Sequence, residues 1–256
     1  MSRFLVLKNG LNAGVRIPFS HVVCQILAAL ILPMASSAAE TKVDPPTTAY
    51  EMLQIEGFKV HVSPEVSRDS VLESKVLRVL SVKLDEINHL LSKDQIAKLH
   101  NVHFWIEREK GEPGAVFHPS RDWLIGRNYN PDKAGGIELS NAEHFLAWSQ
   151  TDQPMMVLHE LAHAYMFLVL GEDYPPLQEA WDNANREGLY QSVSYVHGGL
   201  KRAYALTNRD EFFAELSEAY FGQNDYFPFN INDLRAYDPV AFAMVRKAWE
   251  HAPTDI

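Results

Sequence analysis

Two histidines and a glutamate lie close together in the segment His159-Glu160-Leu161-Ala162-His163. Residues four apart on a helix share a face, so both imidazoles can reach one metal ion. Glu160, next to the first histidine, can then reach a water molecule bound to that metal. Two histidine ligands and a neighbouring general base are typical of zinc-dependent hydrolysis. Because the pentapeptide is short, the other parts of such a site must come from elsewhere in the chain.

The residues around this motif are apolar on every side of a helix. Residues 154–171 read PMMVLHELAHAYMFLVLG, and a helix of this kind is expected to be buried. Burying a carboxylate and two imidazoles without partners costs on the order of several kcal/mol, and a bound cation would satisfy all three groups. The alternatives are core histidines held by hydrogen bonds, or a solvated patch, for which the flanking residues leave no polar face. Tyr174-Pro175-Pro176, further on, is predicted to form a turn.

A catalytic zinc ion takes a third protein ligand and keeps one position open for water. In the extended motif HExxHxxGxxH that ligand is the last histidine of the motif. Here the glycine and histidine positions hold Met166 and Val169, so this version is excluded. The third ligand is therefore expected on another element, as in gluzincins, where a glutamate on a downstream helix completes the site.

Residues 208–222, NRDEFFAELSEAYFG, are predicted to form that second helix. Glu211, Glu215 and Glu218 fall on one stripe of it, at spacings of four and three. Apolar residues fill nearly all other positions, and carboxylates that face a core repel one another unless cations or donors face them. The alternatives are an ordinary solvated face, or a capping box formed by Asn208 and Glu211.

The pattern Tyr204-x6-Glu211-Phe-Phe-Ala-Glu, downstream of HELAH, resembles the catalytic domain of anthrax toxin lethal factor. It is similar also to the wider set of secreted bacterial metallopeptidases that includes the Pro-Pro endopeptidases. The resemblance covers roughly residues 157–222 and does not extend to the other domains of the toxin. It implies that Glu211 is the third zinc ligand, that Tyr204 stabilises the transition state, and that Glu215 is a carboxylate behind the ligands.

These implied roles agree with the chemistry of zinc hydrolases. One zinc ion per chain would polarise the scissile carbonyl and lower the pKa of its bound water. Glu160 would take a proton from that water and pass it to the leaving amine. Tyr204 could donate to the developing oxyanion, and Glu215 could orient a ligand histidine through its other ring nitrogen.

The first 39 residues differ from the rest of the chain. They contain Arg3, Lys8 and Arg16 but no acidic residue, followed by an apolar run at 22–34 and the small residues Ala-Ser-Ser-Ala-Ala at 35–39. This pattern predicts a secretory signal peptide, and the rival is an uncleaved anchor, which the shortness of the run disfavours. The expected location is secreted or periplasmic, without stable membrane association after cleavage.

Composition narrows the chemistry and the partners. The only cysteine, Cys24, lies in the predicted signal peptide, so the mature chain would have neither a disulfide nor a catalytic thiol. Removal of the signal peptide, with its three basic residues, would leave 20 basic and 33 acidic residues, a net charge of −13. Such acidity argues against binding to nucleic acid or to an anionic membrane, and favours solubility and basic substrates. The metallopeptidase resemblance implies a peptide or protein substrate. The oligomeric state is open.

The fold expected is α+β and zincin-like, with a small twisted N-terminal sheet, a helical C-terminal half and the metal cleft between them. Strands are predicted at 58–62, 102–106 and 136–140, and an amphipathic helix at 71–91. Residues 40–57 are predicted to be an exposed linker or N-terminal extension, and residues 58–256 a single domain.

The strand just before the metal helix is a candidate for substrate binding. In zincins with this order of elements, the edge strand of the sheet lines the cleft and pairs with an extended substrate. The residues are Ile137, Glu138, Leu139 and Ser140. The alternative is that they form an ordinary strand inside the sheet.

The sequence as a whole favours a secreted zinc metallopeptidase of the gluzincin type. A catalytically inactive zincin-like module that binds peptides is the alternative from another class. The retention of Glu160 and Tyr204 speaks against it. A metallohydrolase that acts on a non-peptide amide is the third possibility, because activation of water by zinc is the same chemistry.

Overall fold

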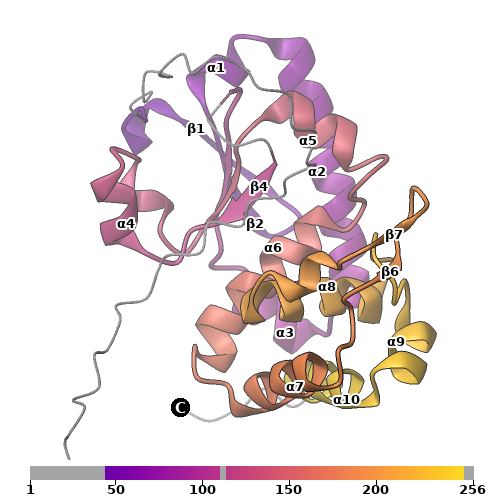
Figure 1. The fold of residues 1–256 in the computed structure, drawn as a ribbon. Helices are drawn as coiled ribbons and strands as arrows, with labels where there is room; N and C mark the ends of the chain where they lie inside the picture. Colours follow the sequence, from indigo (N-terminus) through magenta and orange to yellow (C-terminus); the bar gives the residue numbers. More distant parts are fainter. Residues whose placement is uncertain (1–43, 110–113, 251–256) are drawn as a thin grey trace, which may run out of the picture.

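The computed structural model describes residues 44–109 and 114–250 (Figure 1). A sheet with its covering helices forms one half and a group of helices the other, so the α+β class is confirmed. The signal peptide predicted at 1–39 lies outside the described residues. No helix in the described part of the chain combines the length and the apolar character needed to cross a membrane.

Five strands make a mixed sheet in the order β1-β2-β3-β5-β4. β2, β3 and β5 run parallel to one another, while β1 is antiparallel to β2 and β4 is antiparallel to β5. The three predicted strands are therefore present as β2, β3 and β5, and β1 and β4 add the two edges. The strands are β1 (Glu51–Ile55), β2 (Phe58–Val62), β3 (Phe104–Ile106), β4 (Ala115–Phe117) and β5 (Ile137–Leu139).

Helices cover one face of the sheet and continue into the second half of the molecule (Figure 1). The predicted amphipathic helix is α2, which begins after the N-cap Asp69 and buries one apolar stripe. The helices are α1 (Pro64–Ser67), α2 (Ser70–Leu90), α3 (Lys93–Leu99), α4 (Arg121–Gly126), α5 (Ala142–Trp148), α6 (Met156–Tyr165), α7 (Pro175–Arg186), α8 (Arg209–Phe221), α9 (Ile231–Tyr237) and α10 (Pro239–Glu250).

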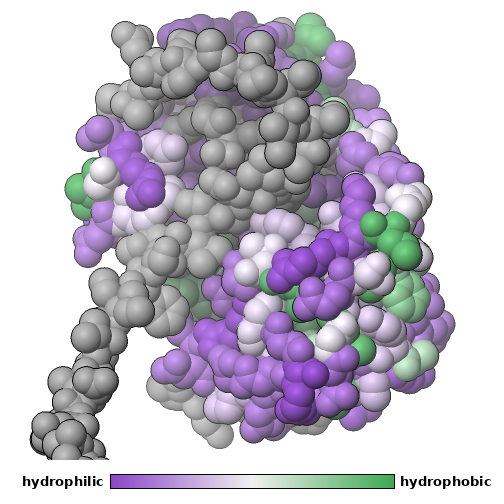
Figure 2. All heavy atoms as spheres, viewed as in Figure 1, coloured by the Kyte–Doolittle hydropathy of each residue, from purple (hydrophilic) through white to green (hydrophobic). Residues whose placement is uncertain are grey.

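Two short elements lie between α7 and α8 in the sequence. A hairpin is formed by β6 (Val193–Ser194) and β7 (Leu200–Lys201), and the 3-10 helix η4 (Tyr204–Leu206) follows it directly. Figure 2 shows that the helical half presents mainly hydrophilic residues on the face in view, with apolar residues confined to small areas. Val196 and Leu200 of the hairpin are among the exposed large apolar side chains.

Residues 44–57 do not form an exposed linker, and this part of the prediction is wrong. β1 pairs with β2 from Glu51↔Val62 to Ile55↔Phe58, and Tyr50 just before it is buried. The backbone N–H of Asn130 donates to Asp44 at 2.8 Å. The segment is therefore part of the domain.

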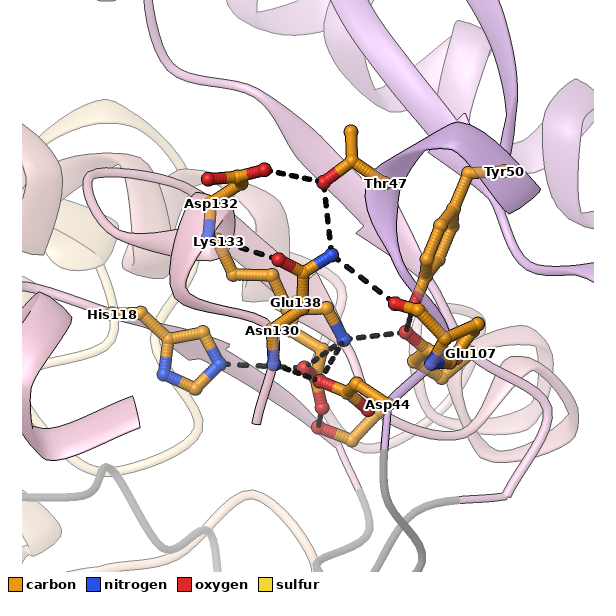
Figure 3. Close-up of polar contacts among 11 residues, drawn as sticks. Asp44, Thr47, Tyr50, Glu107, His118, Asn130, Asp132, Lys133 and Glu138 are labelled. Atoms are coloured by element: carbon orange, nitrogen blue, oxygen red, sulfur yellow. Dashed lines mark hydrogen bonds and ion pairs between the residues drawn. The ribbon is translucent and has the colours of Figure 1, made fainter. Parts of the chain in front are cut away.

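A buried lysine joins this segment to the sheet (Figure 3). Lys133 Nζ lies 2.5 Å from Glu107, 2.6 Å from Glu138 and 3.2 Å from Asp44, and its side chain is fully buried. Tyr50 donates to Glu107 at 2.6 Å. Burial lowers the pKa of Lys133, but the carboxylates of Glu138 and Glu107 outweigh burial and raise it, so the lysine is a cation.

Replacing Lys133 by methionine should strongly destabilise the protein. The change leaves buried carboxylates without their cation, which typically costs about 3–5 kcal/mol. Chemical denaturation measures the loss. Lys83→Met is the matched control, because Lys83 pairs with Glu86 at 3.1 Å near the surface and such pairs contribute about 0–1 kcal/mol. Equal losses in the two variants would contradict the account of the buried cluster.

Candidate metal centre

The predicted metal helix is present as α6, and all ten of its residues are buried. It continues as a π-helix at Met166–Leu170 and ends at Gly171, which has a positive φ of 80°. Glu160 is completely buried, and His159 and His163 are 2% and 7% exposed. The possibility of a solvated histidine patch is therefore excluded, and these polar groups must find partners inside the protein.

The partners of the two histidines lie on α8, which packs against α6. Glu211, Glu215 and Glu218 are all buried, so α8 does not present an ordinary charged surface. Asn208 caps the helix by accepting from the backbone N–H groups of Asp210 and Glu211. The Glu211 carboxylate lies against the imidazoles of α6.

His159, His163 and Glu211 each direct one ligand atom to a common point. Glu211 Oε2 is 3.0 Å from His159 Nε2 and 3.4 Å from His163 Nε2, and the two Nε2 atoms are 3.1 Å apart. Ligands of a tetrahedral zinc ion at about 2.0–2.1 Å are separated by roughly 3.3 Å. The three atoms therefore have the chemistry and the spacing of a zinc site.

The two neighbouring imidazoles determine the protonation state of Glu211. Burial raises the pKa of Glu211, but the charge of His163 and the hydrogen bonds from His159 and His163 outweigh burial and lower the pKa well below its usual range. Glu211 is therefore a carboxylate, the form in which it can bind a metal ion.

The candidate base Glu160 is held by the edge of the sheet. Its Oε2 accepts from the backbone N–H of Phe117 on β4 at 2.8 Å. Within the described ranges, its buried Oε1 has no hydrogen-bond partner. Burial is the largest influence on Glu160 and raises its pKa, although His163 and His159 act in the opposite direction. A raised pKa suits a group that accepts a proton near neutral pH.

Behind the centre, a carboxylate other than the predicted one contacts His159. The resemblance assigns this position to Glu215, but Glu215 Oε1 lies 3.9 Å from His159 Nδ1. Glu218 Oε1 lies 2.6 Å from the same nitrogen. Hydrogen bonds to charged acceptors are about 2.7–2.9 Å long, so only Glu218 is within bonding range. The contact predicted for Glu215 is made by Glu218, one turn further along α8.

Tyr204 lies at the start of η4, which packs against α8. It is half-buried, seven residues before Glu211 and on the approach to α8. Its predicted role toward a substrate oxygen stays a prediction.

The strand predicted to bind substrate is not at the edge of the sheet. β5 pairs with β3 on one side and β4 on the other, and all three of its residues are buried. Glu138 points to Lys133, and Ser140 donates to Glu138 at 3.0 Å. Ile137, Glu138, Leu139 and Ser140 are thus structural, and β4 is the edge strand next to α6.

Comparison with known families decides the class of protein. Residues 54–236 match the family described as glucose-regulated metallo-peptidase M90. The chain belongs to this family. The match supports the metallopeptidase part of the resemblance, but not its assignment to lethal factor and the Pro-Pro endopeptidases. A metallopeptidase acts on peptides or proteins and uses a metal ion, usually zinc. Searches of curated proteins and of solved structures found no match.

Sequence reasoning missed the backbone donor on β4. Its three residues, Ala-Val-Phe, are too few to show an alternating pattern, and a backbone N–H leaves no trace in residue type. The contact made by Glu218 had a signal, because Glu218 lies on the same stripe as Glu211. Spacing alone did not distinguish it from Glu215.

Glu211→Ala should lower both the zinc content and the melting temperature of zinc-loaded protein. The change removes one of three protein ligands, and binding energy contributes to folding stability. Elemental analysis and thermal unfolding measure the two effects. Glu179→Ala, at an exposed position on α7, is the control and should retain full zinc. Full zinc occupancy in Glu211→Ala would point instead to Glu215 or Glu218.

Proposed function

We propose that this metallopeptidase is a secreted, zinc-dependent enzyme of the gluzincin type that hydrolyses peptide bonds. The observation that carries the proposal is the convergence of His159 Nε2, His163 Nε2 and Glu211 Oε2 within 3.0–3.4 Å of one another. The completely buried Glu160, with Oε1 lacking a partner among the described residues, supports the assignment of a base beside the ligands.

A zinc ion held by His159, His163 and Glu211 would polarise the scissile carbonyl and acidify a bound water molecule. Glu160 accepts the proton of the attacking water and delivers it to the nitrogen of the leaving amine. The N–H of Phe117 holds Oε2 of Glu160, which leaves Oε1 to exchange the proton. The bond to β4 thereby holds the Glu160 carboxylate in one orientation.

Tyr204 is proposed to stabilise the oxyanion that forms from the carbonyl oxygen. Its position on η4, directly before the helix that carries Glu211, supports this role. A phenol there can donate to an oxygen whose negative charge grows during the reaction.

The edge strand β4 is proposed to bind the substrate backbone, in place of β5. The bonds Ser140 N to Gly114 O and His118 N to Gly136 O, both 2.9 Å, place alternate residues of β4 toward β5. The backbone groups of Ala115 and the carbonyl of Phe117 therefore point away from β5, toward the edge, where the N–H of Phe117 already donates to Glu160. An extended peptide can add to such an edge as a further strand.

Export is proposed from the basic residues, apolar run and small residues of the first 39 positions. Amino-terminal sequencing of the exported protein tests the cleavage site expected after residue 39.

A mixed peptide library, digested with and without a zinc chelator, tests the activity. The expected result is cleavage that the chelator abolishes and zinc restores. Persistent cleavage with chelator would contradict the zinc mechanism.

Glu160→Gln should retain zinc and lose activity. Glutamine keeps the size and shape of the side chain but cannot accept the proton, so the rate should fall by about 100-fold or more. Peptide hydrolysis and zinc content are the two measurements, with Glu179→Gln as the control at an exposed position. Full activity in Glu160→Gln would remove Glu160 from the mechanism.

Tyr204→Phe should lower kcat with little change in KM. It removes one hydroxyl that acts only as charge develops, and losing an oxyanion donor costs about 3–4 kcal/mol, or roughly 100- to 1000-fold in rate. Steady-state kinetics measures the effect. Tyr220→Phe, which removes a hydrogen bond to Glu250 at the far end of α8, should leave kcat unchanged. A raised KM at normal kcat would mean that Tyr204 only binds substrate.

A further inference from the structure

The three carboxylates of the α8 stripe have different surroundings, although the sequence presents them as equivalent. Glu211 contacts the Nε2 atoms of both histidines. Glu218 reaches the opposite nitrogen of His159, Nδ1, at 2.6 Å. Glu215 stops 3.9 Å short of that nitrogen. His159 is therefore held between two carboxylates of α8, one at each ring nitrogen.

We propose that Glu218, rather than Glu215, is the positioning residue that fixes the tautomer and the ring orientation of His159. This inference rests on the proposed function and refines its metal site. A neutral imidazole carries its proton on one nitrogen only. The Glu218 carboxylate can only accept, so it places the proton on Nδ1. In the neutral ring, the form that binds a metal ion, the lone pair of Nε2 is then available to an ion held together with His163 and Glu211.

Helix geometry explains why Glu218 is better placed than Glu215. With 3.6 residues per turn, seven residues come within about 20° of two full turns, whereas four residues overshoot one turn by about 40°. Glu218 therefore lies almost in line with Glu211 along α8, at a distance of about 10 Å along the axis. The ring of His159 lies between them, with a nitrogen directed to each.

Burial makes this hydrogen bond strong. His159 and Glu218 are 2% and 7% exposed, so water does not compete effectively for either group. A charge-assisted hydrogen bond in such surroundings is roughly twice as strong as a neutral one. A carboxylate that accepts a hydrogen bond from the ring nitrogen facing away from the metal typically raises metal affinity by about 10- to 100-fold. The same contribution is expected from Glu218.

Glu215 serves as the matched comparison within the same helix. It is 5% exposed, and its Oε2 has no hydrogen-bond partner in the described part of the chain. Glu215→Gln and Glu218→Gln make the same chemical change one turn apart in equally buried positions. Burial raises the pKa of Glu215 well above its usual range, so the pair is matched for burial and shape rather than for charge. A difference between the variants therefore reports the contact with His159 rather than burial.

The test measures zinc affinity of the full chain by competition with a chelator. Glu218→Gln should weaken zinc binding by about 10- to 100-fold, whereas Glu215→Gln should change it by less than about threefold. In the metal-free protein, ¹⁵N-labelled histidine should show His159 protonated on Nδ1 with a strongly downfield proton. That resonance should move upfield in Glu218→Gln and stay in place in Glu215→Gln. The wild-type spectrum remains informative if a variant fails to fold.

The opposite ranking of the two variants would overturn the proposal in favour of Glu215. Equal affinities in both variants and wild type, or a His159 that carries no proton on Nδ1, would also overturn it. A wild-type chain that binds no zinc would refute the proposed function instead. In that case the Nδ1 resonance alone decides whether Glu218 orients His159.

Discussion

The structure of the candidate site depends on the packing of α6 against α8. Both helices are buried, and each carries polar side chains that could not lie in a core alone. Packed together, they place two imidazoles against a stripe of carboxylates, so that each helix supplies the partners that the other lacks. This mutual dependence explains how residues 159–163 and 211–218, far apart in sequence, form one compact group.

The sheet completes the site from the other side. The edge strand β4 contacts α6, and the backbone of Phe117 holds one oxygen of Glu160. β4 is in turn held by β5, whose Glu138 contacts the buried Lys133 and through it the segment around Asp44. The N-terminal segment, the sheet and Glu160 are therefore joined by a continuous set of contacts. The predicted linker is thus part of the framework that positions the candidate base.

The sequence predicted the parts of the fold that repeat a pattern over many residues. Helix α2 is predictable because packing requires a long apolar stripe along it. Helices α6 and α8 are predictable because they are buried and so are apolar on nearly every side. The three-residue strand β4 carries no such pattern, so the sequence indicates β5 as the edge of the sheet. The sequence predicts a turn at Pro175, but this residue is the first of α7, where its missing N–H costs nothing. The choice between Glu215 and Glu218 depended on how α8 is rotated against α6, which only tertiary structure determines.

The central claim is that one zinc ion lies between His159, His163 and Glu211. A crystal of the zinc-loaded protein, measured at the zinc absorption edge, tests it most directly. The account predicts a single anomalous peak about 2.0–2.1 Å from Nε2 of both histidines and from a carboxylate oxygen of Glu211. His159 Nδ1, Glu215 and Glu218 form a second group of potential ligands. A peak at that group, or no peak at the first, would contradict the account.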